Sequence, residues 1–198
     1  MSNKTTSQTL VLQPTSMAQW HALIEEARVS SAITLSEDLE SYLILLLMRF
    51  CSDPEIANSV FALDFLQNQS LLNRENRQVM RDVGDKCLLF SGLFPETAER
   101  KRVHISYYVK LGQSAYSSLS ASDSELSQLY DKLCHHFVGL MDVLLTMRSL
   151  DPNATPLNLL EAEDLWHSTQ SAHALSILRN ATQGFLVPRN VILPEHKH

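Results

Sequence analysis

The most constraining feature of the 198-residue sequence is a set of apolar residues that recurs with a regular four-three spacing. Such spacing places side chains on one face of an α-helix that packs lengthwise against antiparallel neighbours. The positions are Leu126, Tyr130, Leu133, Phe137, Leu140, Leu144 and Met147. We predict one long helix from Glu125 to Leu150, opened by a capping box of Ser122 and Glu125. Because flanking positions carry few charges, an intramolecular bundle is favoured over a coiled-coil dimer.

The rest of the chain also has helical patterns. Apolar spacing and capping residues predict helices at about 16–28, 34–48, 54–66, 73–90 and 155–180. The run from Tyr42 to Met48 is apolar on every side, so we expect its helix at the centre of the fold. No segment alternates with period two for long enough to predict a strand. The sequence therefore predicts an all-α single domain over residues 1–198, a bundle of about six to eight helices. Residues 1–14 are expected to be flexible and residues 185–198 to pack on the bundle.

The charge balance argues against a nucleic-acid partner. The formal net charge is −6, whereas phosphate binding requires clustered Lys and Arg. Arg100-Lys101-Arg102 is a short basic run, and Glu96 and Glu99 lie beside it. With 44% hydrophobic and 19% charged residues, the chain has the composition of a globular protein rather than a disordered one.

Cysteine usage and the absence of targeting patterns predict a cytoplasmic protein. The 3 cysteines form no C-x-x-C motif, and an odd number of them suits a reducing compartment. The N-terminal residues lack the apolar core of a signal peptide. The apolar run from Tyr42 to Met48 is far shorter than the roughly 20 residues that a membrane-spanning helix requires. We expect no membrane partner, and either a monomer or a homodimer.

The stretch from Gly84 to Tyr116 is the most unusual part of the chain. It contains three of the five glycines and three of the five tyrosines. In a chain so poor in glycine, each one indicates a positive φ, a helix end or a close approach of backbones. We expect a helix to reach Phe90, to break at Ser91-Gly92 and to restart after Pro95. Further along, a second face of small and aromatic residues is expected to pack closely on a neighbour: Tyr108, Gly112, Ala115 and Leu119.

This stretch carries a resemblance to other sequences. Residues 84–96 fit the pattern G-D-x-x-L-x-F-S-G-x-F-P-E, and residues 107–116 fit Y-Y-x-x-x-G-x-x-A-Y. Both halves resemble a signature of uncharacterised, hypothetical bacterial proteins. The resemblance covers about 33 residues and implies a bacterial cytoplasmic origin and an all-helical fold. It implies no reaction.

Polar side chains in the same stretch are the candidate ligand-binding residues. They are Asp85, Ser91, Glu96, Tyr107, Tyr108 and Tyr116. Tyrosine hydroxyls require partners when buried, and the two carboxyl groups and the serine could supply them. Two arrangements remain open, a buried polar network that fixes the order of the helices and a ligand pocket, and the network is favoured.

No set of residues indicates catalysis, so we predict a non-enzymatic binding or regulatory helical module with an unknown protein or small-molecule partner. The alternative is a small-molecule-binding helical enzyme whose pocket lies in the 84–116 stretch. No catalytic residue, cofactor or metal is predicted. We interpret the residues with metal-binding or nucleophilic chemistry as structural or surface groups: Cys87, His135, His136, Glu163, His167, Gln170 and His173.

Overall fold

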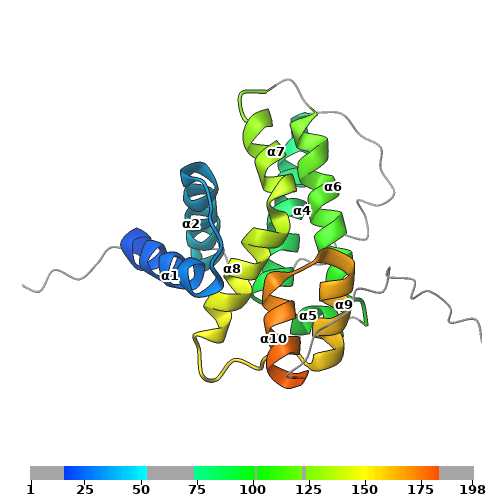
Figure 1. Ribbon diagram of the computed structural model, residues 1–198. Helices are drawn as coiled ribbons and strands as arrows, with labels where there is room; N and C mark the ends of the chain where they lie inside the picture. Colours follow the sequence, from blue (N-terminus) through cyan, green and yellow to red (C-terminus); the bar gives the residue numbers. More distant parts are fainter. Residues whose placement is uncertain (1–15, 53–73, 101, 122–123, 183–198) are drawn as a thin grey trace, which may run out of the picture.

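The computed structural model describes residues 16–52, 74–100, 102–121 and 124–182, and all regular secondary structure in these ranges is α-helical (Figure 1). The helices are α1 (Ser16–Ser31), α2 (Glu37–Ser52), α4 (Arg74–Gly92), α5 (Glu96–Arg100), α6 (Ile105–Ser120), α7 (Ser127–His135), α8 (Phe137–Ser149), α9 (Leu159–Thr169) and α10 (Ala172–Thr182). The predicted all-α, single-domain bundle is confirmed, with eight helices of nine or more residues and the five-residue α5. The predicted helix at 54–66 and both expected terminal segments lie outside the described residues.

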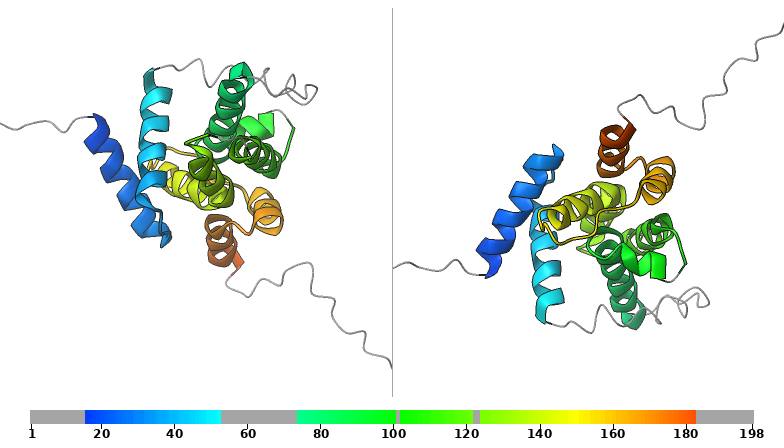
Figure 2. Two further views of the ribbon diagram at one scale, coloured as in Figure 1. Left: turned by 90° about the horizontal axis from the view of Figure 1, so that it is seen from above. Right: turned by 90° about the horizontal axis from the view of Figure 1, so that it is seen from below.

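The centre of the bundle is α8. All seven residues from Leu140 to Thr146 are buried, and α8 packs against α1, α4, α6 and α10. The expectation that the Tyr42–Met48 helix forms the centre was wrong. This helix, α2, lies beside α1 at one side of the molecule, and Leu45 is 55% exposed (Figures 1 and 2). An apolar run shows that most sides of a helix are covered, and it does not show that all of them are.

The predicted helix from Glu125 to Leu150 is two helices, which corrects that expectation. α7 ends at His135 and α8 begins at Phe137, and His136 between them has φ −96° and ψ 11°. The hydrogen bonds from His136 N to Lys132 O and from Leu140 N to His136 O bridge the break. The apolar face therefore continues across it, although Leu126 precedes α7 and is half-exposed.

The predicted helix at 155–180 is also divided. The first part, α9, has Asn158 as its N-cap rather than Thr155, and the Asn158 side chain forms a capping box with Glu161. The C-cap of α9 is Gln170, which adopts the left-handed conformation with φ 60° and ψ 33°. The chain then turns, and α10 packs beside α9 (Figure 1).

Close packing of α4 and α6 explains the glycines of the central stretch. Neither Gly84 nor Gly112 has a positive φ. A Cβ atom at Gly84 would lie 2.5 Å from the ring of Tyr116 on α6. A Cβ atom at Gly112 would lie 2.5 Å from the ring of Phe137 on α8 and 2.8 Å from Cβ of Cys87 on α4. Both positions thus fit the predicted close approach.

Candidate functional site

Asp85 is the centre of a buried polar network. Its side chain is inaccessible to solvent in the middle of α4. Oδ1 accepts hydrogen bonds from the hydroxyls of Tyr42, at 2.6 Å, and Tyr116, at 2.7 Å. Oδ2 accepts a 2.7 Å hydrogen bond from Arg49 Nη2 and lies 3.7 Å from Arg81 Nε. The carboxyl group therefore joins three helices: α2, α4 and α6.

The sequence predicted part of this network. Asp85 and Tyr116 were both candidate residues, and the structure brings them together. Tyr42 and Arg49 were missed, although they are seven residues apart on α2 and so lie on the same helical face. Arg81 was also missed, although an arginine four residues before an aspartate on a helix is a recognisable ion-pair spacing.

Burial dominates the electrostatics of the network. It raises the pKa of the Asp85 carboxyl, while the hydrogen bonds from the two tyrosines and the charges of Arg49 and Arg81 oppose that shift. Burial and the nearby Asp85 also raise the pKa values of the Tyr42 and Tyr116 hydroxyls, so both phenols keep their protons and act as donors. All the donors converge on one carboxyl group, as a buried acid requires.

The other predicted site residues lie elsewhere. Ser91 is buried and donates to the Cys87 and Leu88 carbonyl oxygens of its own helix. Glu96 is partly exposed at the start of α5 and pairs with Arg148 of α8 at 3.1 Å. The Tyr107 and Tyr108 rings are in edge contact with each other. The centroid of the Tyr108 ring also lies 5.8 Å from that of the Phe90 ring. The six candidates therefore do not surround a shared hollow in the described part of the molecule.

A hollow does open beside the Asp85 network, between α4 and the segment that joins α6 to α7. We call it the α4–α7 hollow. It has a volume of about 400 Å³. Its lining consists of Arg77, Gln78, Arg81, Leu119, Ser124, Glu125, Leu126 and Tyr130. Arg81 belongs both to this lining and to the surroundings of Asp85, so the hollow and the network share a side chain.

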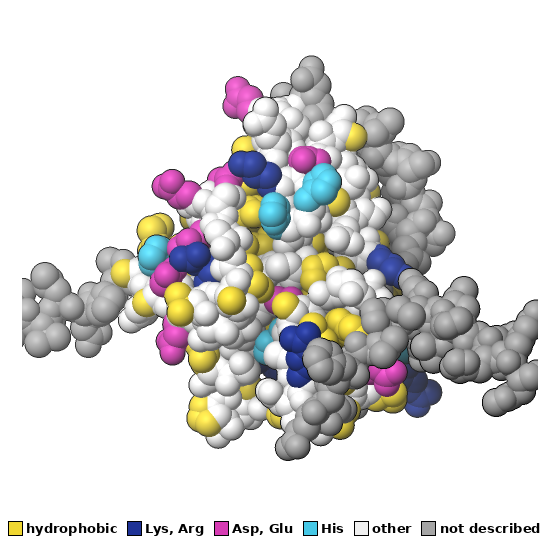
Figure 3. All heavy atoms as spheres, viewed as in Figure 1, with side chains coloured by type: hydrophobic (Ala, Val, Ile, Leu, Met, Phe, Trp, Pro, Cys, Tyr) yellow, Lys and Arg dark blue, Asp and Glu magenta, His cyan; other side chains and the backbone are white. Residues whose placement is uncertain are grey.

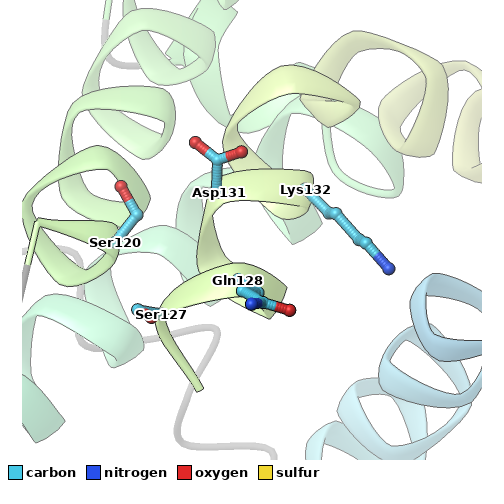
Figure 4. Close-up of a pocket in the computed structure, with 5 residues that line it drawn as sticks. All are labelled: Ser120, Ser127, Gln128, Asp131 and Lys132. Carbon is cyan, nitrogen blue, oxygen red and sulfur yellow. The ribbon is translucent and has the colours of Figure 1, made fainter. Parts of the chain in front are cut away.

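A second hollow, of about 420 Å³, lies at the junction of α6 and α7 (Figure 4). Its lining consists of five polar residues: Ser120, Ser127, Gln128, Asp131 and Lys132. Figure 4 shows Lys132 extending away from Asp131 towards α2, where its Nζ lies 2.6 Å from Asp38 Oδ2. Lys132 therefore forms an ion pair between α2 and α7. The described lining of this hollow has no cluster of like charges that would bind a ligand.

A third hollow, of about 250 Å³, lies along α9 and is lined by two histidines, three acidic residues and one leucine: His104, His167, Glu161, Glu163, Asp164 and Leu160. His104 Nδ1 lies 3.1 Å from Asp164 Oδ2, and His167 Nε2 lies 3.8 Å from Glu163 Oε1. These are separate pairs. The described residues contain no group of three or more His, Cys, Asp or Glu side chains placed to hold a metal ion.

The remaining chemical candidates take structural positions. His173 is on α10 and not on the face of Glu163 and His167, and its Nδ1 lies 3.1 Å from Thr146 Oγ1 on α8. The turn at Gln170 therefore separates His173 from Glu163 and His167. Cys87 is buried, which raises the pKa of its thiol and opposes nucleophilic chemistry. His135 and His136 are exposed.

The visible surface has no single-sign charge field. On the face drawn in Figure 3, basic, acidic and histidine side chains are interspersed with apolar ones. None of the helices that the structure describes is both long enough and apolar enough to cross a membrane. Comparison of the chain with family models, curated proteins and solved structures found no match. The resemblance to hypothetical bacterial proteins stays a prediction.

Proposed function

We propose that this chain is a non-enzymatic binding or regulatory module that takes a small-molecule or protein partner at the α4–α7 hollow. The observation that carries the proposal is the use of Asp85. Both of its oxygens accept close hydrogen bonds from side chains of the protein itself. A catalytic or ligand-binding acid in a pocket would keep at least one oxygen for the substrate. The Asp85 network is thus better suited to fixing α2, α4 and α6, and this supports the binding module over the enzyme with a pocket at 84–116.

The α4–α7 hollow has the properties of a binding site. Its volume of about 400 Å³ falls within the roughly 300–1,000 Å³ that small-molecule sites occupy. Leu119 and Leu126 supply apolar surface, and Arg81 and Tyr130 supply polar groups of defined position. Two of its walls, α4 and α6, belong to helices that the buried network joins, so this part of the site is supported by rigid elements.

Location and partner class follow from the same considerations. We propose a bacterial cytoplasmic protein that binds neither nucleic acid nor membranes and is a monomer or homodimer. The net charge of −6 supports the absence of a nucleic-acid partner, and the free thiols of Cys51, Cys87 and Cys134 support a reducing compartment.

The experiment is a fragment screen by nuclear magnetic resonance on the ¹⁵N-labelled full chain. We expect fragments to perturb the backbone amides of Gln78, Leu119 and Tyr130, which lie in three different walls of the hollow. Bound fragments should be recovered chemically unchanged. Perturbations confined to other parts of the molecule would contradict the proposed site, and conversion of a bound fragment would favour the enzyme.

A further inference from the structure

We infer that the α4–α7 hollow binds an oxyanion, the carboxylate or phosphate group of a small organic ligand, with Arg81 as its principal donor. The inference rests on the proposed function, because it names the chemical class of ligand for that same hollow.

Arg81 has one donor, Nε, that the described residues do not use. A guanidinium carries five N–H donors in a planar fork that matches an oxyanion. Arg81 Nε lies 3.7 Å from Asp85 Oδ2, which is too long for a hydrogen bond, and it has no hydrogen-bond partner among the described residues. The guanidinium instead lies over the ring of Tyr42, 5.8 Å from its centroid. An aromatic face compensates the positive charge but accepts no strong hydrogen bond.

The carboxyl group of Asp85, which pairs with Arg81, lies closer to another arginine. Asp85 Oδ2 is 1.0 Å closer to Arg49 than to Arg81, at 2.7 Å against 3.7 Å. Arg49 Nη1 also lies 3.3 Å from Asp82 Oδ1, so Arg49 forms ion pairs with two acidic residues. The positive charge of Arg81 is thus less closely paired than that of Arg49, and its partly exposed side chain lines the hollow.

The other walls suit an organic anion better than a bare inorganic one. Arg77 lies one turn before Arg81 on α4 and adds a second positive charge on the same helical face. Arg77, Arg81 and Tyr130 all line the hollow, so the two guanidinium groups and the phenol surround the same space. Leu119 and Leu126 provide the apolar part, suited to an aromatic or aliphatic group that carries the anion.

Among the described residues of this lining, Glu125 is the one acidic residue, and its charge opposes the binding of an anion. It is exposed at the edge of the hollow, in the segment before α7. It therefore offers a sensitive test: if an anion binds here, removing this charge should tighten binding without disturbing the core.

The test is a titration of the ¹⁵N-labelled full chain with benzoate, phenyl phosphate and the neutral isostere benzamide. We expect the two anions to perturb the hollow and benzamide to bind at least several-fold more weakly. A response to benzoate alone or phenyl phosphate alone would assign the carboxylate or the phosphate source. Arg81→Gln should weaken anion binding about ten-fold or more, because it removes hydrogen bonds to a charged group. Glu125→Gln should tighten it by about two- to five-fold.

The controls separate this inference from a general charge effect and from the proposed function. Glu26→Gln changes the net charge equally on the exposed surface of α1, and it should leave the affinity unchanged. If Arg81→Gln does not fold, Glu125→Gln still decides, and an unchanged or weaker affinity in that variant overturns the inference. Absence of saturable anion binding up to about 10 mM also overturns it. If benzamide binds the hollow while both anions fail, the oxyanion assignment is lost and the proposed binding site stands.

Discussion

The hydroxyl of Tyr116 donates a 2.7 Å hydrogen bond to Oδ1 of Asp85, and the ring of Tyr116 lies against the backbone of Gly84. Two adjacent residues of α4 thus receive one side chain of α6: the glycine leaves room for the ring, and the aspartate accepts its hydroxyl. Because Tyr42 and Arg49 of α2 reach the same carboxyl group, this contact also determines how α2 lies on α4.

Asp85→Asn should destabilise the protein. If the amide oxygen accepts from the two tyrosines, the NH₂ group faces Arg49 Nη2, and two donors oppose each other. If the amide is reversed, the two tyrosine hydroxyls lose their acceptor. Losing a hydrogen bond to a charged group and leaving buried donors unsatisfied costs about 1–3 kcal/mol. Chemical denaturation measures this cost. Asp82→Asn is the control, because Asp82 is 39% exposed and pairs with the same arginine, and it should cost about 1 kcal/mol or less. A wild-type midpoint for Asp85→Asn would instead favour a carboxyl group kept for a ligand.

Tyr42→Phe and Tyr116→Phe should show coupled effects. Each variant removes one hydroxyl from Oδ1 of Asp85 and leaves the other in place, so each should cost about 1–2 kcal/mol. The double variant leaves that buried oxygen with neither hydroxyl. We expect it to cost more than the sum of the single variants by about 0.5 kcal/mol or more. A double-mutant cycle by urea denaturation tests this, and simple additivity would mean that the hydroxyls act independently.

The helices could be predicted from the sequence because their spacing and caps are local. The breaks at His136 and Gln170 could not. Neither position has the glycine or proline that usually marks a helix end, and Gln170 adopts a left-handed conformation that side chains rarely favour. The packing of the neighbouring helices determines these turns.

Only those residues of the candidate site that lie in the 84–116 stretch could be predicted from the sequence. Asp85 and Tyr116 stand out because they belong to one glycine-rich, tyrosine-rich stretch. Tyr42 and Arg49 lie 43 and 36 residues before Asp85, and their contacts with it depend on how α2 packs in three dimensions. The α4–α7 hollow is similarly assembled from α4, α6 and α7, and no single segment indicates its shape.

Two glycine-to-alanine changes should have opposite effects. At Gly112 a new Cβ atom would lie 2.5 Å from the Phe137 ring, so Gly112→Ala should overpack the core and cost on the order of 1–3 kcal/mol. At Gly139 on α8 the nearest atom would be Ile33 Cγ2 at 3.8 Å, an ordinary contact. Gly139→Ala should therefore stabilise the protein by about 0.5–1 kcal/mol, through helix propensity. Thermal and urea unfolding give both values, and a stabilising Gly112→Ala would exclude close packing at that position.

The last prediction concerns Asp142, which joins α8 to α10. Its carboxyl group accepts hydrogen bonds from the Ser171 hydroxyl and, at 2.8 Å, from the Ala172 backbone N–H at the start of α10. Burial raises the pKa of this carboxyl to about 6, from an ordinary value of 3.8. The folded protein therefore binds this proton more tightly than the unfolded chain does. The resulting contribution to stability is present below about pH 4 and is lost as the pH rises through about 6, by on the order of 2–3 kcal/mol.

Asp142→Asn isolates that contribution, because asparagine does not titrate. We expect the free energy of unfolding of the wild type, relative to the variant, to fall between pH 4 and pH 6 and to level off above pH 7. The nearby His173 acts in the opposite direction, since burial and Arg148 lower its pKa and its contribution grows as the pH rises towards 6.5. It is present in both proteins, so the difference between them reports Asp142. Urea denaturation at pH 4, 5, 6 and 7 provides the measurement. Parallel curves for the two proteins would show that Asp142 titrates in the folded state as it does in the unfolded chain.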